Sequence, residues 1–287
     1  MERADFHGHP ILHPEYEKKF GLEKYVRLSI ERGITIPPIT AFTGDLPDSR
    51  FQDFYEDSIP QSWHKEQFRE GFVVFATGQY QTQRIIFFRT QEIVMKDDTH
   101  LLLAGLPRYA IPRRKIDETI QEAKDLGAII IADHPFLGGW HGGFGKENIL
   151  KYREDLHALE VNAQMTNALG LFSFGMFKQK PNNERVYDIA QEVGLPVVAN
   201  SDFHMNYMTW LPFFHGSTNT LGRAYTTFLE LSSKSEKWAE EIKKQLKEKY
   251  TQAHLEYNSL GDIWRFGIPS LLAGSKDVVR FKKSYRT

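Results

Sequence analysis

Short, continuous apolar runs alternate with amphipathic helical segments along most of this chain, and this alternation constrains the fold more than any other feature. The helical segment "RRKIDETIQEAKDLG" leads directly into the apolar run "AIIIADHP", and "NNERVYDIAQEVG" leads in the same way into "LPVVANSDFH". Apolar strands separated by helices are typical of parallel sheets with crossover helices. The pattern therefore predicts an α/β fold with parallel strands.

The composition limits the size and the domain organisation of the fold. With 287 residues, 41% of them hydrophobic, the chain is long enough for one large α/β domain or two small ones. From about Ser232 the charge density rises, and "SEKWAEEIKKQLKEKYTQAHLEY" has the pattern of a long charged helix. We therefore expect a main body over residues 1–231 and a charged helical extension over residues 232–287, packed on the same domain.

Charge and cysteine content exclude several kinds of partner and site. A formal net charge of -1 provides no general attraction to nucleic acid or to an anionic membrane. The chain has no cysteine, so any metal site must use His, Asp or Glu. Its apolar runs are too short to span a bilayer, and the first residues lack the pattern of a signal peptide. We therefore expect a soluble, cytoplasmic protein with no membrane partner.

Histidines and carboxylates occur where the predicted strands end, which is where ligands bind in parallel α/β folds. Residues i and i+2 of a strand point to the same face, so His7 and His9 project together, as do Asp202 and His204. His134 ends a third strand, and a glutamate lies in the strand "RIIFFRTQEI". Such a set is large enough to bind more than one divalent ion, as hydrolytic sites with two metals do.

These motifs, taken in order, resemble those of the PHP (polymerase and histidinol phosphatase) family. The chain carries H-x-H in "DFHGHP", a glutamate in "RTQEI", a histidine that opens "HLLLAGL", the strand end "IIADHPF" and SD-x-H in "NSDFH". A family strand of the type "iEvyN" also resembles "LEVNA". The resemblance covers roughly Ala4 to Leu229. The matching motif residues are His7, His9, Glu92, His100, His134, Asp202 and His204.

The resemblance implies a distorted (β/α)7 TIM-like barrel and metal-dependent hydrolysis of phosphoesters with two or three divalent ions, Zn, Mn or Fe. It also implies how the ligands divide between the ions. One ion would be held by His7, His9, Glu92 and Asp202. The second would be held by Glu92, His100 and His134.

The ligands of a third ion are incomplete. By the resemblance this ion would use His204, a residue such as His13, and the histidine of a "TDH" motif. The matching stretch "RGITIPPITAFTG" lacks that motif, and Phe42 falls about where its histidine would be. We therefore expect two firmly bound ions. Pro37 and Pro38 also indicate that this strand is reshaped.

Catalytic and substrate-binding candidates lie around these ligands. The resemblance gives Asp202, His204 and His13 catalytic roles, the histidines as acid, base or ligand. The glycine-rich "LGGWHGGFG" places His141 just after a predicted ligand, where it could cover a substrate. Arg113, before a helix, and His215, in "PFFHGSTN", are further candidates for substrate binding.

Three functions remain open from the sequence. We expect a phosphoesterase that acts on a small phosphorylated metabolite or nucleotide. A PHP-type nuclease is less favoured, because the net charge is nearly neutral. A catalytically degenerate PHP-like module that binds metal or a partner is also less favoured, because an idle site need not keep so many costly ionisable groups together. The oligomeric state stays open.

Overall fold

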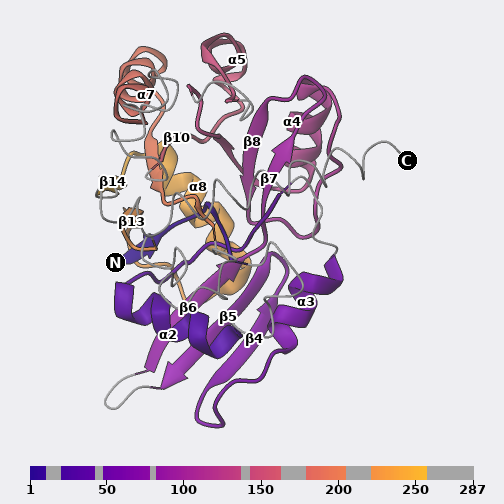
Figure 1. The fold of residues 1–287 in the computed structure, drawn as a ribbon, viewed down its shortest axis with the longest axis vertical. Helices are drawn as coiled ribbons and strands as arrows, with labels where there is room; N and C mark the ends of the chain where they lie inside the picture. Colours follow the sequence, from indigo (N-terminus) through magenta and orange to yellow (C-terminus); the bar gives the residue numbers. More distant parts are fainter. Residues whose placement is uncertain are drawn as a thin grey trace, which may run out of the picture.

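A computed structural model describes residues 1–10, 21–42, 48–77, 82–136, 143–162, 179–204 and 221–256 (Figure 1). Its described strands form four sheets, of which the largest has six strands in the order β11-β10-β9-β8-β7-β3. The strands of this central sheet are β3 (Thr40–Phe42), β7 (Thr90–Val94), β8 (His100–Ala104), β9 (Ile129–Ala132), β10 (Ala158–Asn162) and β11 (Val197–Asn200).

The central sheet is mostly parallel, as the alternation of apolar runs and helices predicts. β9, β10 and β11 pair in parallel, and so do β3 and β7. Only β8 runs against its neighbours β7 and β9, because a short turn with Asp98 at a φ of 63° folds it back onto β7. The α/β class is confirmed. Closure of seven parallel strands into a barrel stays a prediction, since the described strands pair in separate sheets.

The three smaller sheets flank this central sheet. β1 pairs antiparallel with β13, and β13 with β14, whereas β2 and β12 form a parallel pair. A third sheet is an antiparallel meander of β4, β5 and β6. The strands of these sheets are β1 (Glu2–Ala4), β2 (Gly8–His9), β4 (His64–Phe68), β5 (Gly71–Thr77), β6 (Thr82–Phe88), β12 (Phe203–His204), β13 (Ala224–Phe228) and β14 (Gln252–Leu255).

Two segments that the sequence pattern predicts as single elements are each divided in the structure. The run "RIIFFRTQEI" breaks at Arg89 into β6 and β7, which belong to different sheets, and the buried guanidinium of Arg89 donates to the carbonyls of Leu106 and Pro107 at 2.8 and 2.7 Å. The charged helix predicted after Ser232 is shorter than its sequence pattern. It ends before Lys249, which has a φ of 58°, and the chain then forms β14.

Helices cover both faces of the central sheet and one face of the meander. α2 and α3 lie against the meander (Figure 1). They pack on β5 and β6 through Tyr25, Phe54, Phe72 and Phe87. α4, α5 and α7 contribute to the core on one face of the central sheet, and α8 to the core on the other. None of the described helices is long and apolar enough to cross a membrane. The helices are α2 (Leu22–Arg32), α3 (Asp48–Glu56), α4 (Ile116–Asp125), α5 (Lys146–Tyr152), α7 (Gln179–Val193), the 3-10 turn η2 (Ser235–Lys237) and α8 (Trp238–Lys247).

Candidate metal centre

The candidate site lies on one face of the central sheet, where its parallel strands end. Alternation along the strands decides which side chains face it. Ile131 and Val198 pack in the core that contains α8, whereas their neighbours Ile130 and Ala199 pack in the opposite core. By the same alternation, a row of polar side chains lies on the face of the sheet that α8 covers, just past the last apolar residues of each strand. This row consists of Glu92, His100, Asp133, Glu160 and Asn200.

The N-terminal H-x-H motif meets the SD-x-H motif across the pair of β2 and β12. In this register His9 lies opposite His204. The backbone N–H of Asp202 donates to the carbonyl of His7 at 2.8 Å. These contacts bring two motifs that lie far apart in the sequence to the polar row of the sheet.

His7, His9 and Asp202 each present one donor atom to a first group, and Glu92 lies beside its two histidines. The Nε2 atoms of His7 and His9 are 3.2 Å apart, and Oδ1 of Asp202 lies 3.4 and 3.6 Å from them. Oε2 of Glu92 lies 3.5 Å from Nε2 of His7 and 3.2 Å from Nε2 of His9. Ligands about 2.0–2.2 Å from a tetrahedral ion are separated by about 3.4 Å, so the atoms of His7, His9 and Asp202 have the spacing that a divalent ion requires, with Oε2 of Glu92 beside the two histidines.

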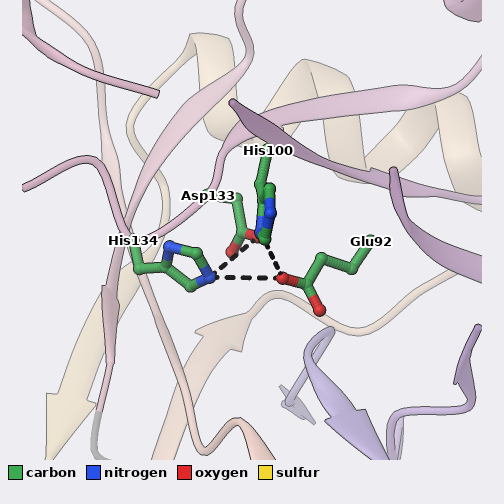
Figure 2. Close-up of side chains that lie close together, drawn as sticks. All are labelled: Glu92, His100, Asp133 and His134. Carbon is green, nitrogen blue, oxygen red and sulfur yellow. Dashed lines mark hydrogen bonds and ion pairs between the residues drawn. The ribbon is translucent and has the colours of Figure 1, made fainter. Parts of the chain in front are cut away.

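The second oxygen of Glu92 belongs to a second group (Figure 2). Oε1 of Glu92 lies 2.7 Å from Nδ1 of His100 and 3.3 Å from Nε2 of His134. Oδ2 of Asp133 completes the group at 3.2 Å from Nε2 of His134 and 4.0 Å from Nδ1 of His100. Glu92 therefore presents one oxygen to each group, as a carboxylate between two metal ions does.

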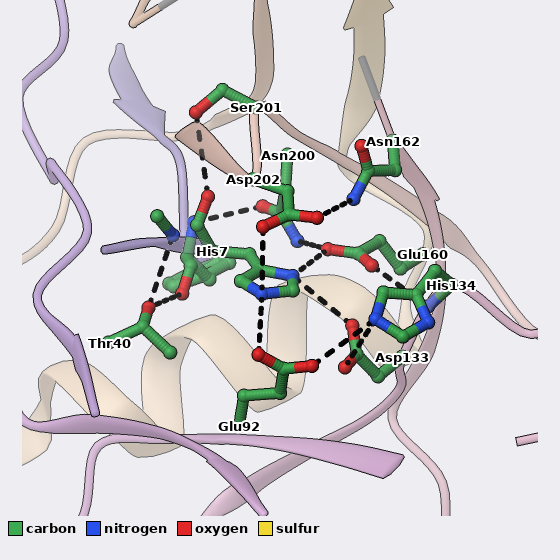
Figure 3. A network of polar contacts seen from close by, with 12 residues as sticks. His7, Thr40, Glu92, Asp133, His134, Glu160, Asn162, Asn200, Ser201 and Asp202 are labelled. Atoms are coloured by element: carbon green, nitrogen blue, oxygen red, sulfur yellow. Dashed lines mark hydrogen bonds and ion pairs between the residues drawn. The ribbon is translucent and has the colours of Figure 1, made fainter. Parts of the chain in front are cut away.

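Hydrogen bonds outside the donor groups fix the orientation of the ligands (Figure 3). Nδ1 of His9 lies 3.1 Å from the carbonyl of Thr40, to which it donates, so that Nε2 is left as the ligand atom. The amide of Asn162 donates to Oδ2 of Asp202 at 3.1 Å, which leaves Oδ1 for the first group. Asp202 itself has a φ of 44°, a strained backbone of the kind that concentrates at functional sites.

The site concentrates buried charge. Burial disfavours the ionised form of Glu92, but hydrogen bonds from His100, His134, His7 and His9 hold its pKa well below the usual value. Burial lowers the pKa of His134, but Asp133 and Glu92 raise it to about 10. The protein without metal therefore compensates its buried carboxylates with protonated histidines.

Two of these groups lack hydrogen-bond partners within the described part of the chain. Both oxygens of Asp133 are buried without a hydrogen bond, although each lies 3.1–3.2 Å from a histidine nitrogen, and Nδ1 of His134 is also buried without one. Burial raises the pKa of Asp133 well above its usual value. A bound cation would compensate such a carboxylate directly, so the residues present fit a divalent ion.

The structure brings together six of the seven predicted metal ligands. They are His7, His9, Glu92, His100, His134 and Asp202. The backbone of His204 lies in β12, but its side chain is outside what the structure describes. His13, His141 and His215 also lie outside the described residues. Arg113 lies in a turn with a φ of 62°, and its half-exposed side chain pairs with Asp98.

Asp133 and Glu160 were not predicted, although both are fully buried among the ligands. A signal for Glu160 was its position in "ALEVN", where a glutamate interrupts an apolar strand. Alternation would place Asp133 and its neighbour His134 on opposite faces. The unusual φ of 20° at His134 turns both side chains toward the site.

Phe42 occupies the position where the resemblance calls for a histidine. In the pairing of β3 with β7 it lies opposite Glu92. The centre of its ring is 6.3 Å from that of His9 and 5.9 Å from that of His100. A hydrocarbon ring therefore stands beside both donor groups and offers neither of them a ligand atom.

No family model matches this chain, and no curated protein is similar to it in sequence. Solved structures do resemble its fold. PsfC from Pseudomonas syringae PB-5123 aligns over 96% of this chain and 99% of its own, with a TM-score of 0.56 and 14% identity. A two-domain protein from Bacteroides vulgatus ATCC 8482 that contains a predicted PHP-like metal-dependent phosphoesterase aligns over 89% of this chain, with a TM-score of 0.52 and 18% identity.

A third similar structure is the lesion-specific endonuclease EndoQ from Pyrococcus furiosus, which aligns over 86% of this chain with a TM-score of 0.53 and 14% identity. The chain spans 65% of the Bacteroides protein and 56% of the endonuclease. At such low identity these likenesses establish the fold alone. The fold of this chain is similar to that of a protein that contains a predicted PHP-like domain.

Proposed function

We propose that this chain is a metal-dependent phosphoesterase with two divalent ions, Zn, Mn or Fe, at the ends of its central strands. The observation that carries the proposal is the position of Glu92, whose two oxygens each face a separate group of three further donors. The likeness to a protein with a predicted PHP-like phosphoesterase supports it. The proposal retains the barrel that the resemblance implies for residues 1–231.

The ligands divide by their geometry. His7, His9, Asp202 and Glu92 would hold one ion. The other would be held by Glu92, with His100, Asp133 and His134. When bound, such ions lower the pKa of water and neutralise charge that develops on a phosphoryl group.

Two other residues orient ligands of the first ion. Thr40 orients His9, and Asn162 orients Asp202. Asp202, His204 and His13 remain the proposed candidates for catalytic roles beyond ligation.

A small phosphorylated metabolite or nucleotide is the substrate class that we favour, with His141, His215 and Arg113 as candidate contacts. A nucleic-acid substrate is the second candidate, because a similar structure shows Endonuclease Q with a duplex that has an abasic lesion at the active site. The formal net charge of -1 favours the small substrate, since proteins that bind nucleic acid neutralise many phosphates with Lys and Arg.

Elemental analysis tests the proposal first. The chain is purified without chelator or metal-affinity resin, beside a His7→Ala, Asp202→Ala double variant. We expect two equivalents of metal in the wild type and a loss in the variant. The loaded protein is then assayed with a phosphate monoester, a nucleotide and a duplex with an abasic site. Absence of bound metal after incubation with Mn²⁺ or Zn²⁺ would refute the proposal of a metal-dependent hydrolase. A catalytically degenerate module that binds a partner would then be the remaining hypothesis.

A further inference from the structure

We propose that Glu160 is a positioning residue that holds one ligand of each ion, His7 and His134, in a fixed relation. The inference deepens the proposed function and rests on it, because it concerns the same two ions. Glu160 is fully buried in β10 and comes from the polar row of the central sheet. The close-up of the network shows it between the two histidines (Figure 3).

The contact with His7 selects the nitrogen that faces the metal. Nδ1 of His7 lies 2.9 Å from Oε1 of Glu160 and donates to it, while Oδ1 of Asp133 lies slightly farther from the same nitrogen, at 3.1 Å. This bond keeps the proton on Nδ1, so Nε2 remains free to face the first donor group, 3.2 Å from Nε2 of His9. A carboxylate that accepts from the outer nitrogen of a ligating histidine fixes both its ring orientation and its tautomer.

The contact with His134 acts on the backbone. The N–H of His134 donates to Oε2 of Glu160 at 2.9 Å. His134 has a φ of 20°, which a non-glycine residue rarely adopts, and this conformation lets its ring and the carboxylate of Asp133 reach the same site. Glu160 therefore supports the chain at the residue where the second donor group depends on an unusual backbone.

Glu160 is itself held by the strand beside it. The amide of Asn200 donates to Oε1 of Glu160 at 2.8 Å. Oδ1 of Asn200 in turn accepts the backbone N–H of Phe6, the residue before His7, at 2.8 Å. The orientation of Glu160 thus follows from the backbone that carries the H-x-H motif.

These bonds distinguish Glu160 from a ligand. His7, Asp133 and Glu160 also lie close enough together to hold an ion. However, an ion there would need Nδ1 of His7, and His7 would have to bind two ions through both nitrogens. The oxygens of Glu160 already accept three hydrogen bonds, whereas those of Asp133 accept none within the described residues. Oδ1 of Asp133 lies 3.1 Å from Nδ1 of His7, and its Oδ2 faces Nε2 of His134 in the second donor group at 3.2 Å. Asp133 therefore presents an oxygen to that group, whereas Glu160 uses both of its oxygens as hydrogen-bond acceptors.

The substitution Glu160→Gln tests this role at constant size. Glutamine has one oxygen for three donors that approach from two sides. If that oxygen faces His7 and Asn200, the NH₂ group meets the N–H of His134. If it faces His134, the NH₂ group meets His7 and Asn200. In either orientation, the NH₂ group of glutamine faces an N–H donor of His7 or of His134, and the hydrogen bond to that ligand is lost.

The variant is titrated with Zn²⁺ against a competing chelator and with Co²⁺ by visible absorption. We expect Glu160→Gln to bind two ions at saturation, each about 10 to 100-fold more weakly, with an altered Co²⁺ spectrum. Glu160→Asp keeps both oxygens on a shorter side chain and should restore part of the affinity. The matched control is Glu122→Gln, since Glu122 is also buried but pairs with Arg108 and Arg114 away from the donor groups.

The possible results distinguish failure of the positioning role of Glu160 from failure of the proposed metal-dependent function. Unchanged affinities in Glu160→Gln would overturn the positioning role and leave the metal centre intact. Loss of one ion at saturation would show that Glu160 is a ligand. A wild type that binds no ion would remove both proposals. Circular dichroism checks that each variant folds. If Glu160→Gln does not fold, Glu160→Asp takes its place, and metal affinities equal to those of the wild type would then overturn the positioning role.

Discussion

The substitution Glu92→Gln tests the shared carboxylate most directly. In the wild type, Oε2 lies 3.2 Å from Nε2 of His9, and Oε1 lies 2.7 Å from Nδ1 of His100. Glutamine keeps the shape but offers one neutral oxygen and one NH₂ group. One donor group therefore keeps an uncharged oxygen, while the other faces a group that cannot bind a cation.

The geometry sets the size of the effect. Removing one partner of a buried ion pair costs about 3–5 kcal/mol, and about 1.4 kcal/mol corresponds to a factor of ten in affinity. We therefore expect the affinity for at least one ion to fall by a factor on the order of 10² to 10⁴. Hydrolysis should fall with it, because both ions act on the same phosphoryl group.

Competition titration with a chelator measures both affinities, and elemental analysis of the dialysed protein gives the number of ions that remain. Glu2→Gln serves as the control, because Glu2 is a buried glutamate that pairs with Arg84 away from the donor groups. Two tightly bound ions in Glu92→Gln would refute the shared carboxylate, since no single amide oxygen could replace it.

Three further predictions follow from the same structure. Phe42→His adds a donor beside both groups, and elemental analysis should then find a third equivalent of metal; an unchanged count contradicts the prediction. Burial lowers the pKa of His134 from 6.5, but carboxylates raise it to about 10, so its stabilisation is complete below pH 6.5 and is lost as the pH rises toward 10. Urea unfolding of the metal-free protein should show this decline, and His134→Gln should flatten it. Ile131→Ala, in the core beneath the site, should cost about 2–5 kcal/mol of stability without changing metal stoichiometry, which thermal unfolding and elemental analysis check.

The predicted metal ligands were recognised from the spacing of residues within each motif and from the order of the motifs. His7 and His9 are two residues apart, so any extended backbone turns them to the same side, and the structure brings them together. The pairing of β2 with β12 joins distant parts of the chain, and only the order of the motifs indicated it. Local geometry and motif order were sufficient to predict that these side chains lie together.

The residues that were missed depend on geometry that a pattern does not contain. Asp133 shares the site with its neighbour His134 only because His134 departs from extended backbone. Glu160 acquires its role from Asn200, on the neighbouring strand. The break at Arg89 between two sheets depends on carbonyls that the later chain presents to its guanidinium. Tertiary contacts determine each of these features.

The balance of charge at the site argues for two ions. Four carboxylates gather among the ligands, those of Glu92, Asp133, Glu160 and Asp202, and ionised together they carry four negative charges. Two divalent cations neutralise this charge with the histidines uncharged, which is the form in which histidine binds metal. Without ions, the raised pKa values of His7 and His134 show protons taking over part of that neutralisation. A third divalent ion would need a further ligand beside these groups, and the ring of Phe42 supplies none.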